Sequence, residues 1–145
     1  MKLSTKGRYG MRAMVDLGIH SEHEPVSISS IAARQQISDR YLEQLIGKLK
    51  KAGLVSSVRG AQGGYQLARD PGEISAGDIL RVLEGDLMSV TCDGDGDGDT
   101  PCCEVSDYCV TRYVWQKVHE GIIAAVDNLT LAELIEQSKG MHGGC

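Results

Sequence analysis

The sequence contains no phenylalanine, and aromatic residues make up only 4% of its 145 residues. Its hydrophobic core must therefore consist mainly of Leu, Ile, Val, Met and Ala side chains, and at this length such a core is modest. The N-terminus, MKLSTKGRYG, has no apolar run long enough for a signal peptide or a membrane span. We therefore expect a cytoplasmic protein with no membrane partner.

Residues typical of an enzyme active site are also missing. No nucleophile–base motif or phosphate-binding loop is present, and the four histidines form no recognisable constellation. We therefore expect no enzymatic activity.

The cysteines are few but crowded, since four of the five lie between positions 92 and 109: Cys92, Cys102, Cys103 and Cys109. In a reducing cytoplasm this crowding favours metal or redox chemistry over disulfide bridges. No CxxC pair occurs, which argues against a zinc ribbon and against ferredoxin-type spacing. Thiolates are soft ligands that suit an iron–sulfur cluster. A zinc site, a metal-free thiol–disulfide sensor and inert thiols are the alternatives.

The net charge of −5 conceals two halves of opposite sign. Residues 1–69 contain 11 Lys and Arg against 5 Asp and Glu, whereas residues 70–145 contain 4 against 15. A basic first half indicates a polyanionic partner, and double-stranded DNA is the one that we expect. The alternative is an ordinary solvated surface.

The spacing of apolar residues predicts three helices at the start of the chain. The first follows Ser4 or Thr5 as its cap and runs to about residue 20, and a short second helix follows Ser29 or Ser30 and ends near residue 35. A tight turn at residues 36–37 leads to Ser38, a good N-cap for the third helix. The third helix has a buried face at helical spacing, made of Leu42, Leu45, Ile46 and Leu49.

Two β-prone runs, residues 54–58 and 65–67, flank a glycine-rich segment at residues 59–64 and predict a hairpin. Three helices, the last two joined by a tight turn, and a hairpin make a winged helix-turn-helix. We assign this DNA-binding domain to residues 1–72. The fold class is therefore mainly α, with a two-stranded wing.

The remainder of the chain divides into four segments. Residues 73–91 form a connecting helix, 76–84, with a linker, and residues 92–109 form the cysteine loop. Residues 110–138 contain a long helix, about 110–128, and a terminal helix, 131–137, for which Thr130 and Glu133 fit a capping box. Residues 139–145 form a flexible tail.

The long helix has more apolar surface than packing on one small domain requires. Its stripe consists of Val110, Val114, Val118, Ile122, Ala125 and Leu129. We expect a second copy of the helix to cover this stripe in a homodimer. Packing against the first helix is the alternative, and both contacts can coexist.

The third helix is expected to enter the major groove of DNA. Its outward residues can contact base edges or phosphates, and they are Ser38, Arg40, Tyr41, Glu43 and Gln44. Arg59 at the wing tip suits a narrow minor groove. Phosphate contacts are expected from Lys6 and Arg8, and also from Lys2 and Arg12. The alternative is a set of plain solvated side chains.

Several stretches resemble the iron–sulfur cluster regulators (IscR type) and their relatives among bacterial winged-helix transcription factors. The most specific are LSTKGRYG, YLEQLIGKLKKAGLVSSVRGAQGGY, the cysteine loop, CVTRYVW and LTLAEL, and the resemblance extends to about Gln137. It implies a homodimeric transcription factor with a 2Fe–2S cluster, rather than 4Fe–4S, on Cys92, Cys103 and Cys109. It also implies that Glu43 discriminates between DNA sites and that Arg59 enters the minor groove.

The sequence departs from this family at the fourth cluster ligand. A His three residues after the last Cys completes the site in the best-known member, and Arg112 stands there in this sequence. Arginine stays protonated and has no free lone pair, so it is not a ligand. The candidates are Cys102, which softness favours, Glu104, His119 and a group from the partner subunit.

We therefore predict a transcriptional regulator that senses iron–sulfur cluster, iron or redox status, with cluster-assembly proteins as further partners. One alternative is a cluster-free regulator of the same fold that responds to thiols or cysteine metabolism. A different class, an iron–sulfur carrier, would need neither a basic recognition helix nor a wing.

Overall fold

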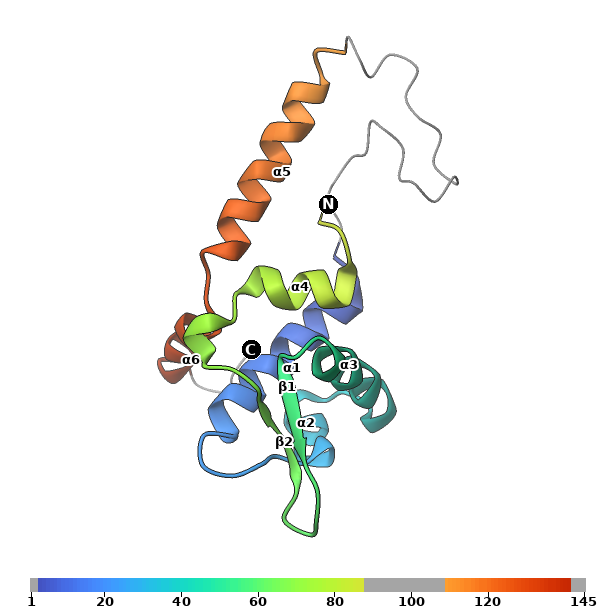
Figure 1. The fold of residues 1–145 in the computed structure, drawn as a ribbon, viewed down its shortest axis with the longest axis vertical. Helices are drawn as coiled ribbons and strands as arrows, with labels where there is room; N and C mark the ends of the chain where they lie inside the picture. The colour runs from blue at the N-terminus through green and yellow to red at the C-terminus, as the bar shows by residue number, and fades with distance from the viewer. Residues whose placement is uncertain (1–2, 88–108, 142–145) are drawn as a thin grey trace.

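Helix α1 (Thr5–His20) lies at the centre of the fold and contacts helices from both halves of the chain. The structure, a computed structural model, describes residues 3–87 and 109–141, and Figure 1 shows the arrangement of their elements. Ser4 caps α1 by accepting a hydrogen bond of 3.2 Å from the backbone N–H of Lys6. Of the two predicted caps, Ser4 is therefore the one used, and the predicted end at about residue 20 is confirmed.

Helices α2 (Ile28–Gln35) and α3 (Asp39–Lys51) form the helix-turn-helix. The expected N-cap of α2, Ser29 or Ser30, is wrong, because Ser27 accepts the capping hydrogen bond from the backbone N–H of Ser30 at 3.2 Å. Three neighbouring serines are equally eligible by residue type, and Ser27 is the one that directly follows Val26, whose backbone is paired with Tyr65 of the wing. The turn itself depends on Gln36, whose backbone is left-handed with φ 54° and ψ 48°.

Strands β1 (Val55–Val58) and β2 (Gly64–Leu67) form the antiparallel wing, with Val55 opposite Leu67 and Val58 opposite Gly64. The base of the wing is attached to the loop between α1 and α2. Val26 and Tyr65 exchange two backbone hydrogen bonds of 2.8 and 2.7 Å. Both strands begin within one residue of their predicted positions.

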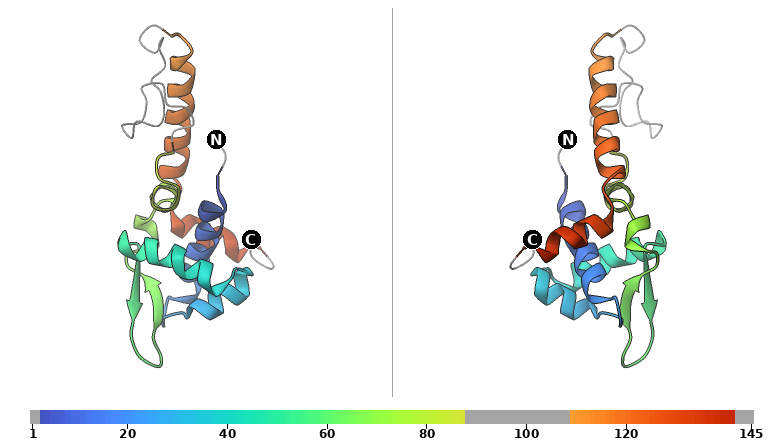
Figure 2. Two further views of the ribbon diagram at one scale, coloured as in Figure 1. Left: turned by 90° about the vertical axis from the view of Figure 1, so that its right-hand side faces the viewer. Right: turned by 90° about the vertical axis from the view of Figure 1, so that its left-hand side faces the viewer.

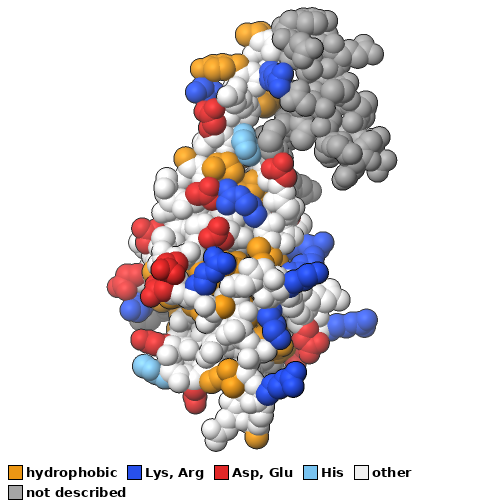
Figure 3. Space-filling model, in the orientation of Figure 1, with side chains coloured by type: hydrophobic (Ala, Val, Ile, Leu, Met, Phe, Trp, Pro, Cys, Tyr) orange, Lys and Arg blue, Asp and Glu red, His pale blue; other side chains and the backbone are white. Residues whose placement is uncertain are grey.

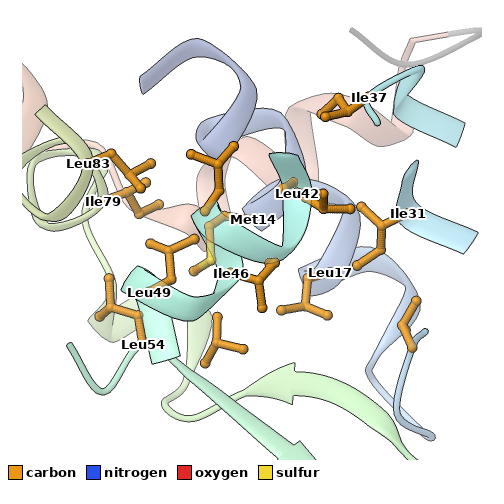
Figure 4. Close-up of a cluster of buried hydrophobic side chains, with 14 of the residues drawn as sticks. Met14, Leu17, Ile31, Ile37, Leu42, Ile46, Leu49, Leu54, Ile79 and Leu83 are labelled. Carbon is orange, nitrogen blue, oxygen red and sulfur yellow. The ribbon is translucent and has the colours of Figure 1, made fainter. Parts of the chain in front are cut away.

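The core is aliphatic, as the lack of phenylalanine requires. Figure 4 shows that side chains from α1, α2, α3 and α4 (Ala76–Glu84) point toward one another. The predicted buried face of α3 is confirmed, since Leu42, Leu45, Ile46 and Leu49 are at most 1% exposed. Burial of a side chain of this kind contributes about 1.5–3 kcal/mol to folding.

The connection from the wing to α4 contains a short 3-10 helix, η1 (Pro71–Glu73), that the sequence pattern did not indicate. It begins with a proline after Asp70, whose side chain accepts a hydrogen bond from the backbone N–H of Gly72 at 2.8 Å. Helix α4 then starts at the predicted residue, with a complete capping box between Ser75 and Asp78.

Helix α5 (Arg112–Asp127) projects away from the other helices, as Figures 1 and 2 show. It starts two residues after the predicted position, since Val110 and Thr111 form a turn before it; Thr111, its N-cap, makes no side-chain capping hydrogen bond. None of its residues is buried, and its principal contact is with α4. Within residues 3–87 and 109–141, no helix has both the length and the apolar character needed to cross a membrane.

Helix α6 (Leu131–Lys139) returns the chain to α1 and ends two residues later than predicted. The capping box of Thr130 and Glu133 is confirmed. Two backbone hydrogen bonds of 2.8 Å fix the entry to this helix, from Ala76 N–H to the Leu129 carbonyl and from Leu131 N–H to the Ile74 carbonyl.

A bidentate ion pair connects α4 to the last turn of α5. The guanidinium of Arg81 donates hydrogen bonds of 2.7 and 2.8 Å to the two carboxylate oxygens of Asp127. The pair passes over Gly77, where a Cβ atom would lie 2.0 Å from Asp127 Oδ1. Hydrogen bonding to Arg81 holds the pKa of Asp127 below its usual range.

This pair predicts a specific dependence of stability on pH. Since the pKa of Asp127 is lower in the folded chain than in the unfolded one, its contribution is present above the unfolded value, about 3.9, and is lost as pH falls through the folded value. We expect Asp127→Asn to flatten the loss of unfolding free energy on acidification below about pH 5, measured by urea denaturation at fixed protein concentration.

Arg81→Met should flatten the same curve, and the double variant should add nothing further. Parallel pH curves for the wild type and Asp127→Asn would show that the ion pair contributes nothing to folding.

Candidate nucleic-acid interface and thiol site

The residues of α3 expected to contact DNA lie near the N-terminus of the helix. Ser38 caps the helix, as predicted, by accepting a hydrogen bond from the backbone N–H of Tyr41 at 3.2 Å. Arg40, Glu43 and Gln44 are all exposed, and they lie on the side of the helix opposite its buried face. Their side chains can exchange hydrogen bonds with base edges, so the geometry is that of a recognition helix.

Tyr41 differs from its neighbours because it is half-buried. Its ring packs edge-to-face against Tyr9, with centroids 6.0 Å apart and an interplanar angle of 86°. Its hydroxyl lies 3.1 Å from Oγ1 of Thr5. Tyr41 therefore connects α3 to the first two turns of α1, and its predicted contact with DNA stays a prediction.

The wing tip has the small residues that a close approach to a duplex requires. Arg59 is exposed, and the turn after it closes with a hydrogen bond of 3.0 Å from Gly63 N–H to the Gly60 carbonyl. A Cβ atom at Gly63 would lie 2.1 Å from the Val58 carbonyl oxygen, and Gly60 has a φ of 111°. Both glycines are thus required by the shape of the tip.

Of the residues expected to contact phosphates, Lys6 and Arg8 are exposed on the first turns of α1. Arg12 is placed differently, because its guanidinium donates hydrogen bonds to the side chain and the backbone carbonyl of Gln35 and lies 5.4 Å from the centroid of the Tyr9 ring. Arg12 therefore connects α1 to the end of α2. Lys2 lies outside the described residues.

The charges separate in space as well as in sequence. Figure 3 shows Lys and Arg side chains along the side of the molecule that carries α3, whereas Asp and Glu side chains gather over α6 on the opposite side. This arrangement places positive potential where the recognition helix is exposed.

A buried ionic network supports the turn of the helix-turn-helix, and sequence reasoning missed it. Asp16 is only 3% exposed, and it accepts hydrogen bonds from Arg34 at 2.7 and 2.9 Å and from the side chain of Gln35 at 2.9 Å. These groups immediately precede the left-handed residue Gln36. The signal was an acidic residue within the apolar stripe of α1.

The thiol of Cys109 lies just before α5, half-buried, with its Sγ atom 2.9 Å from Oγ1 of Thr111. The Thr111 hydroxyl, and after it the backbone N–H of Thr111, lowers the pKa of this thiol. Stabilisation of the thiolate suits both metal ligation and thiol chemistry. The other predicted ligands, Cys92, Cys102 and Cys103, lie outside the described residues.

The described ranges contain no group of three His, Cys, Asp or Glu that could hold a metal ion. His119 is on α5, ten positions after Cys109, and its buried Nδ1 atom has no hydrogen-bond partner among the described residues. His119 lies about 12 Å along the helix axis from Thr111, the N-cap of α5. This distance disfavours His119 and Cys109 of one chain as ligands of a single cluster.

A recognition helix, a wing and a basic face define a winged-helix DNA-binding regulator. The model of the Rrf2 family, described as an iron-dependent transcriptional regulator, matches residues 3–137. The chain belongs to the Rrf2 family of transcriptional regulators.

Relatives of established name cover almost the whole chain. The HTH-type transcriptional regulator IscR of Klebsiella pneumoniae is 40% identical over 139 residues, which is 96% of this chain and 82% of that protein. Protein rrf2 of Nitratidesulfovibrio vulgaris is 41% identical over 138 residues, 95% of this chain and 89% of that protein.

Two solved structures share the fold. IscR of T. potens has a TM-score of 0.75 at 50% identity, and the alignment covers 94% of this chain and 88% of the other. CymR, the global cysteine regulator of B. subtilis, has a TM-score of 0.78 at 39% identity, and the alignment covers 94% and 98%. The predicted family, the mainly helical winged-helix fold and the role in transcription regulation are thus confirmed.

Contacts to bases and contacts to phosphates should be separable by mutation. We expect Lys6→Ala to weaken binding to all sequences and to reduce the slope of log affinity against log salt by about 0.9. Glu43→Ala should instead reduce discrimination between operator variants by about tenfold at single positions, since a mismatched base pair costs about 1–3 kcal/mol.

Fluorescence anisotropy with labelled duplexes at several salt concentrations measures both effects. Lys139→Ala on α6 is the control for the loss of one positive charge and should change neither quantity. Equal loss of affinity for every sequence in Glu43→Ala would contradict base reading by this residue.

Proposed function

We propose that this Rrf2-family regulator binds operator DNA as a homodimer and that a cysteine-ligated iron–sulfur cluster controls its affinity or its choice of site. The observation that carries the proposal is the position of Cys109, a thiol with a lowered pKa at the start of the helix that projects from the DNA-binding unit. A ligand bound at Cys109 would act on α5, the helix that would set the distance between the two DNA-binding units of a dimer.

The described part of the donor set fits such a cluster. The stabilised thiolate of Cys109 is a soft ligand, and Cys92 and Cys103 would supply two more, with Cys102 favoured as the fourth. The cluster, 2Fe–2S rather than 4Fe–4S, would supply a redox- and iron-dependent centre. Glu104 and a group from the partner subunit are the other candidates for the fourth position, whereas its distance from Cys109 disfavours His119 of the same chain.

Thermodynamic linkage limits what such a cluster can do. It shifts DNA affinity only by the difference between its own affinities for the two conformations of the dimer, and DNA shifts cluster affinity by the same factor. The Arg81–Asp127 ion pair and the backbone hydrogen bonds at Leu129 and Leu131 connect α5 and α6 to the DNA-binding unit. Through these contacts, a shift of α5 caused by a ligand at Cys109 would be transmitted to α4.

The likeness to CymR favours a second candidate, a cluster-free regulator that responds to thiols or cysteine metabolism. That structure is named as a global cysteine regulator and has 39% identity to this chain. A thiol with a lowered pKa also suits this chemistry, because the thiolate is the reactive species. Direct analysis of bound iron separates the two candidates.

The apolar stripe of α5 supports the homodimer. Val114 of this stripe is 49% exposed and Val118 40%, the neighbouring Trp115 is 39% exposed, and α5 has no buried residue. A second α5 helix would remove this surface from water. The proposal keeps the division of the chain into a DNA-binding unit, a connecting helix, a cysteine loop and a dimerisation segment. We place the protein in the cytoplasm, where operator DNA and cluster-assembly proteins are available, and assign it no enzymatic activity.

Anaerobic purification tests the cluster. We expect reconstituted protein to be coloured and to contain iron and acid-labile sulfide in equal amounts. Compared with metal-free protein, it should select different DNA sequences or bind the same sequences with different affinity. Cys109→Ser should lose the iron, whereas Cys145→Ser is the control and should keep it. Colourless, iron-free protein after reconstitution would contradict cluster sensing, and a response of DNA binding to thiol oxidants would then support the second candidate.

The homodimer predicts that a charge in the apolar stripe prevents self-association. Val118→Glu should weaken dimerisation by at least about tenfold, because an unpaired carboxylate would be buried between the helices. Gln116→Glu adds the same charge elsewhere on α5 and is the control. Sedimentation equilibrium measures the association constant, and an unchanged constant in Val118→Glu would show that this stripe is not the interface.

A further inference from the structure

Glu84, the last residue of α4, makes a set of contacts that neither its position in the sequence nor the proposed function explains. Its Oε1 atom accepts hydrogen bonds from the backbone N–H of Ser4 at 3.0 Å, from the Ser4 hydroxyl at 2.6 Å and from the backbone N–H of Gly7 at 2.8 Å. The donors lie 80 and 77 positions away in the sequence. The carboxylate therefore caps the first turn of α1 from another helix.

The contact requires a glycine at position 7. A Cβ atom at Gly7 would lie 2.6 Å from Glu84 Oε1 and 3.1 Å from its Cγ atom, so the glycine admits the carboxylate to the helix end. The Ser4 hydroxyl, and after it the N–H groups of Gly7 and Ser4, lowers the pKa of Glu84, while burial opposes this. A negative charge at a helix N-terminus is also favoured by the helix dipole.

The capped turn in turn contacts the recognition helix. Thr5 lies between the two donors, and its Oγ1 atom is 3.1 Å from the hydroxyl of Tyr41 on α3. One turn further along α1, Tyr9 receives the edge-to-face contact of the Tyr41 ring. The position of the first turn of α1 therefore determines the surroundings of Tyr41, next to the exposed residues Arg40 and Glu43.

Helix α4 is also attached to α5, because Arg81 is three positions before Glu84 and holds Asp127. One helix thus contacts both the proposed dimerisation helix and, through Glu84, the helix that supports α3. Resting on the proposed DNA-binding function, we propose that Glu84 is a positioning residue for DNA recognition: it fixes the first turn of α1, and through Thr5 and Tyr41 it fixes the recognition helix.

Simple electrostatics predicts the opposite effect of removing this carboxylate. Glu84 lies close enough to Lys6 for Lys6 to lower its pKa. Removal of a negative charge beside a phosphate-binding lysine would by itself strengthen DNA binding. A weakening of DNA binding on truncation of Glu84 therefore cannot arise from the loss of its charge.

The test compares Glu84→Ala with Glu84→Gln in the full-length protein. We expect Glu84→Ala to weaken binding to the selected operator by about tenfold and to leave binding to random DNA unchanged or slightly tighter. Glu84→Gln retains an acceptor at Oε1 and should restore operator affinity to within about threefold. Glu133→Ala removes the capping carboxylate of α6 and is the matched control, expected to leave both affinities unchanged.

A spectroscopic readout addresses the recognition helix itself. In protein with labelled tyrosine, the ring of Tyr9 shifts the resonances of Tyr41, and Tyr41→Phe assigns them. We expect this shift to diminish in Glu84→Ala, to persist in Glu84→Gln and to persist in Glu133→Ala. If Glu84→Ala is too unstable to study, Glu84→Asp replaces it, because this substitution shortens the side chain and keeps its charge.

Unchanged operator affinity together with unchanged Tyr41 resonances in the truncated variants would overturn the inference. Equal weakening in Glu84→Ala and Glu133→Ala would also overturn it, since it would show only a general loss of stability. Failure of the wild type to prefer any DNA sequence would instead contradict the proposed function, and the Tyr41 resonances would still decide whether Glu84 positions α3.

Discussion

The close packing of α1 against its neighbours is the constraint on which the rest of the structure depends. Three glycines on one helix make it possible: a Cβ atom at Gly10 would lie 2.0 Å from a Leu83 methyl carbon, and one at Gly18 would lie 2.5 Å from a methyl carbon of Ile135. Together with Gly7, these residues cost about 3 kcal/mol of helix propensity relative to alanine. The buried face of α1 must offset that cost, so α4 and α6 are held against the DNA-binding unit at short distance and with little freedom to slide.

This packing gives the molecule two functional ends joined by α4. At one end, the recognition helix and the wing present exposed polar side chains over an aliphatic core, and the buried carboxylate of Asp16 holds Arg34 beside the turn. At the other end, α5 has no fully buried residue and follows a thiol, Cys109, with a lowered pKa. Within the described residues, the Arg81–Asp127 ion pair and the backbone hydrogen bonds at Leu129 and Leu131 connect these two ends.

The sequence predicted most of the local structure, because helix caps and apolar spacing are short-range signals. The starts of α1, α3, α4 and α6 all coincide with a capping Ser or Thr. The errors lie where several residues satisfy the same local rule, as with the serines before α2, or where no cap exists, as at Thr111. Long-range contacts could not be predicted: nothing in the spacing of Glu84 indicates that it meets Ser4, and Arg12, which local reasoning assigned to phosphate, is held by Gln35.

The uncovered stripe of α5 has a consequence for gene control. With this stripe covered by a second copy, as proposed, the DNA-binding species is the pair, and at low abundance its amount grows with the square of the number of chains. Operator occupancy would then change steeply over a narrow range of expression level. A regulator built in this way responds to how much of it the cell has made as well as to what it senses.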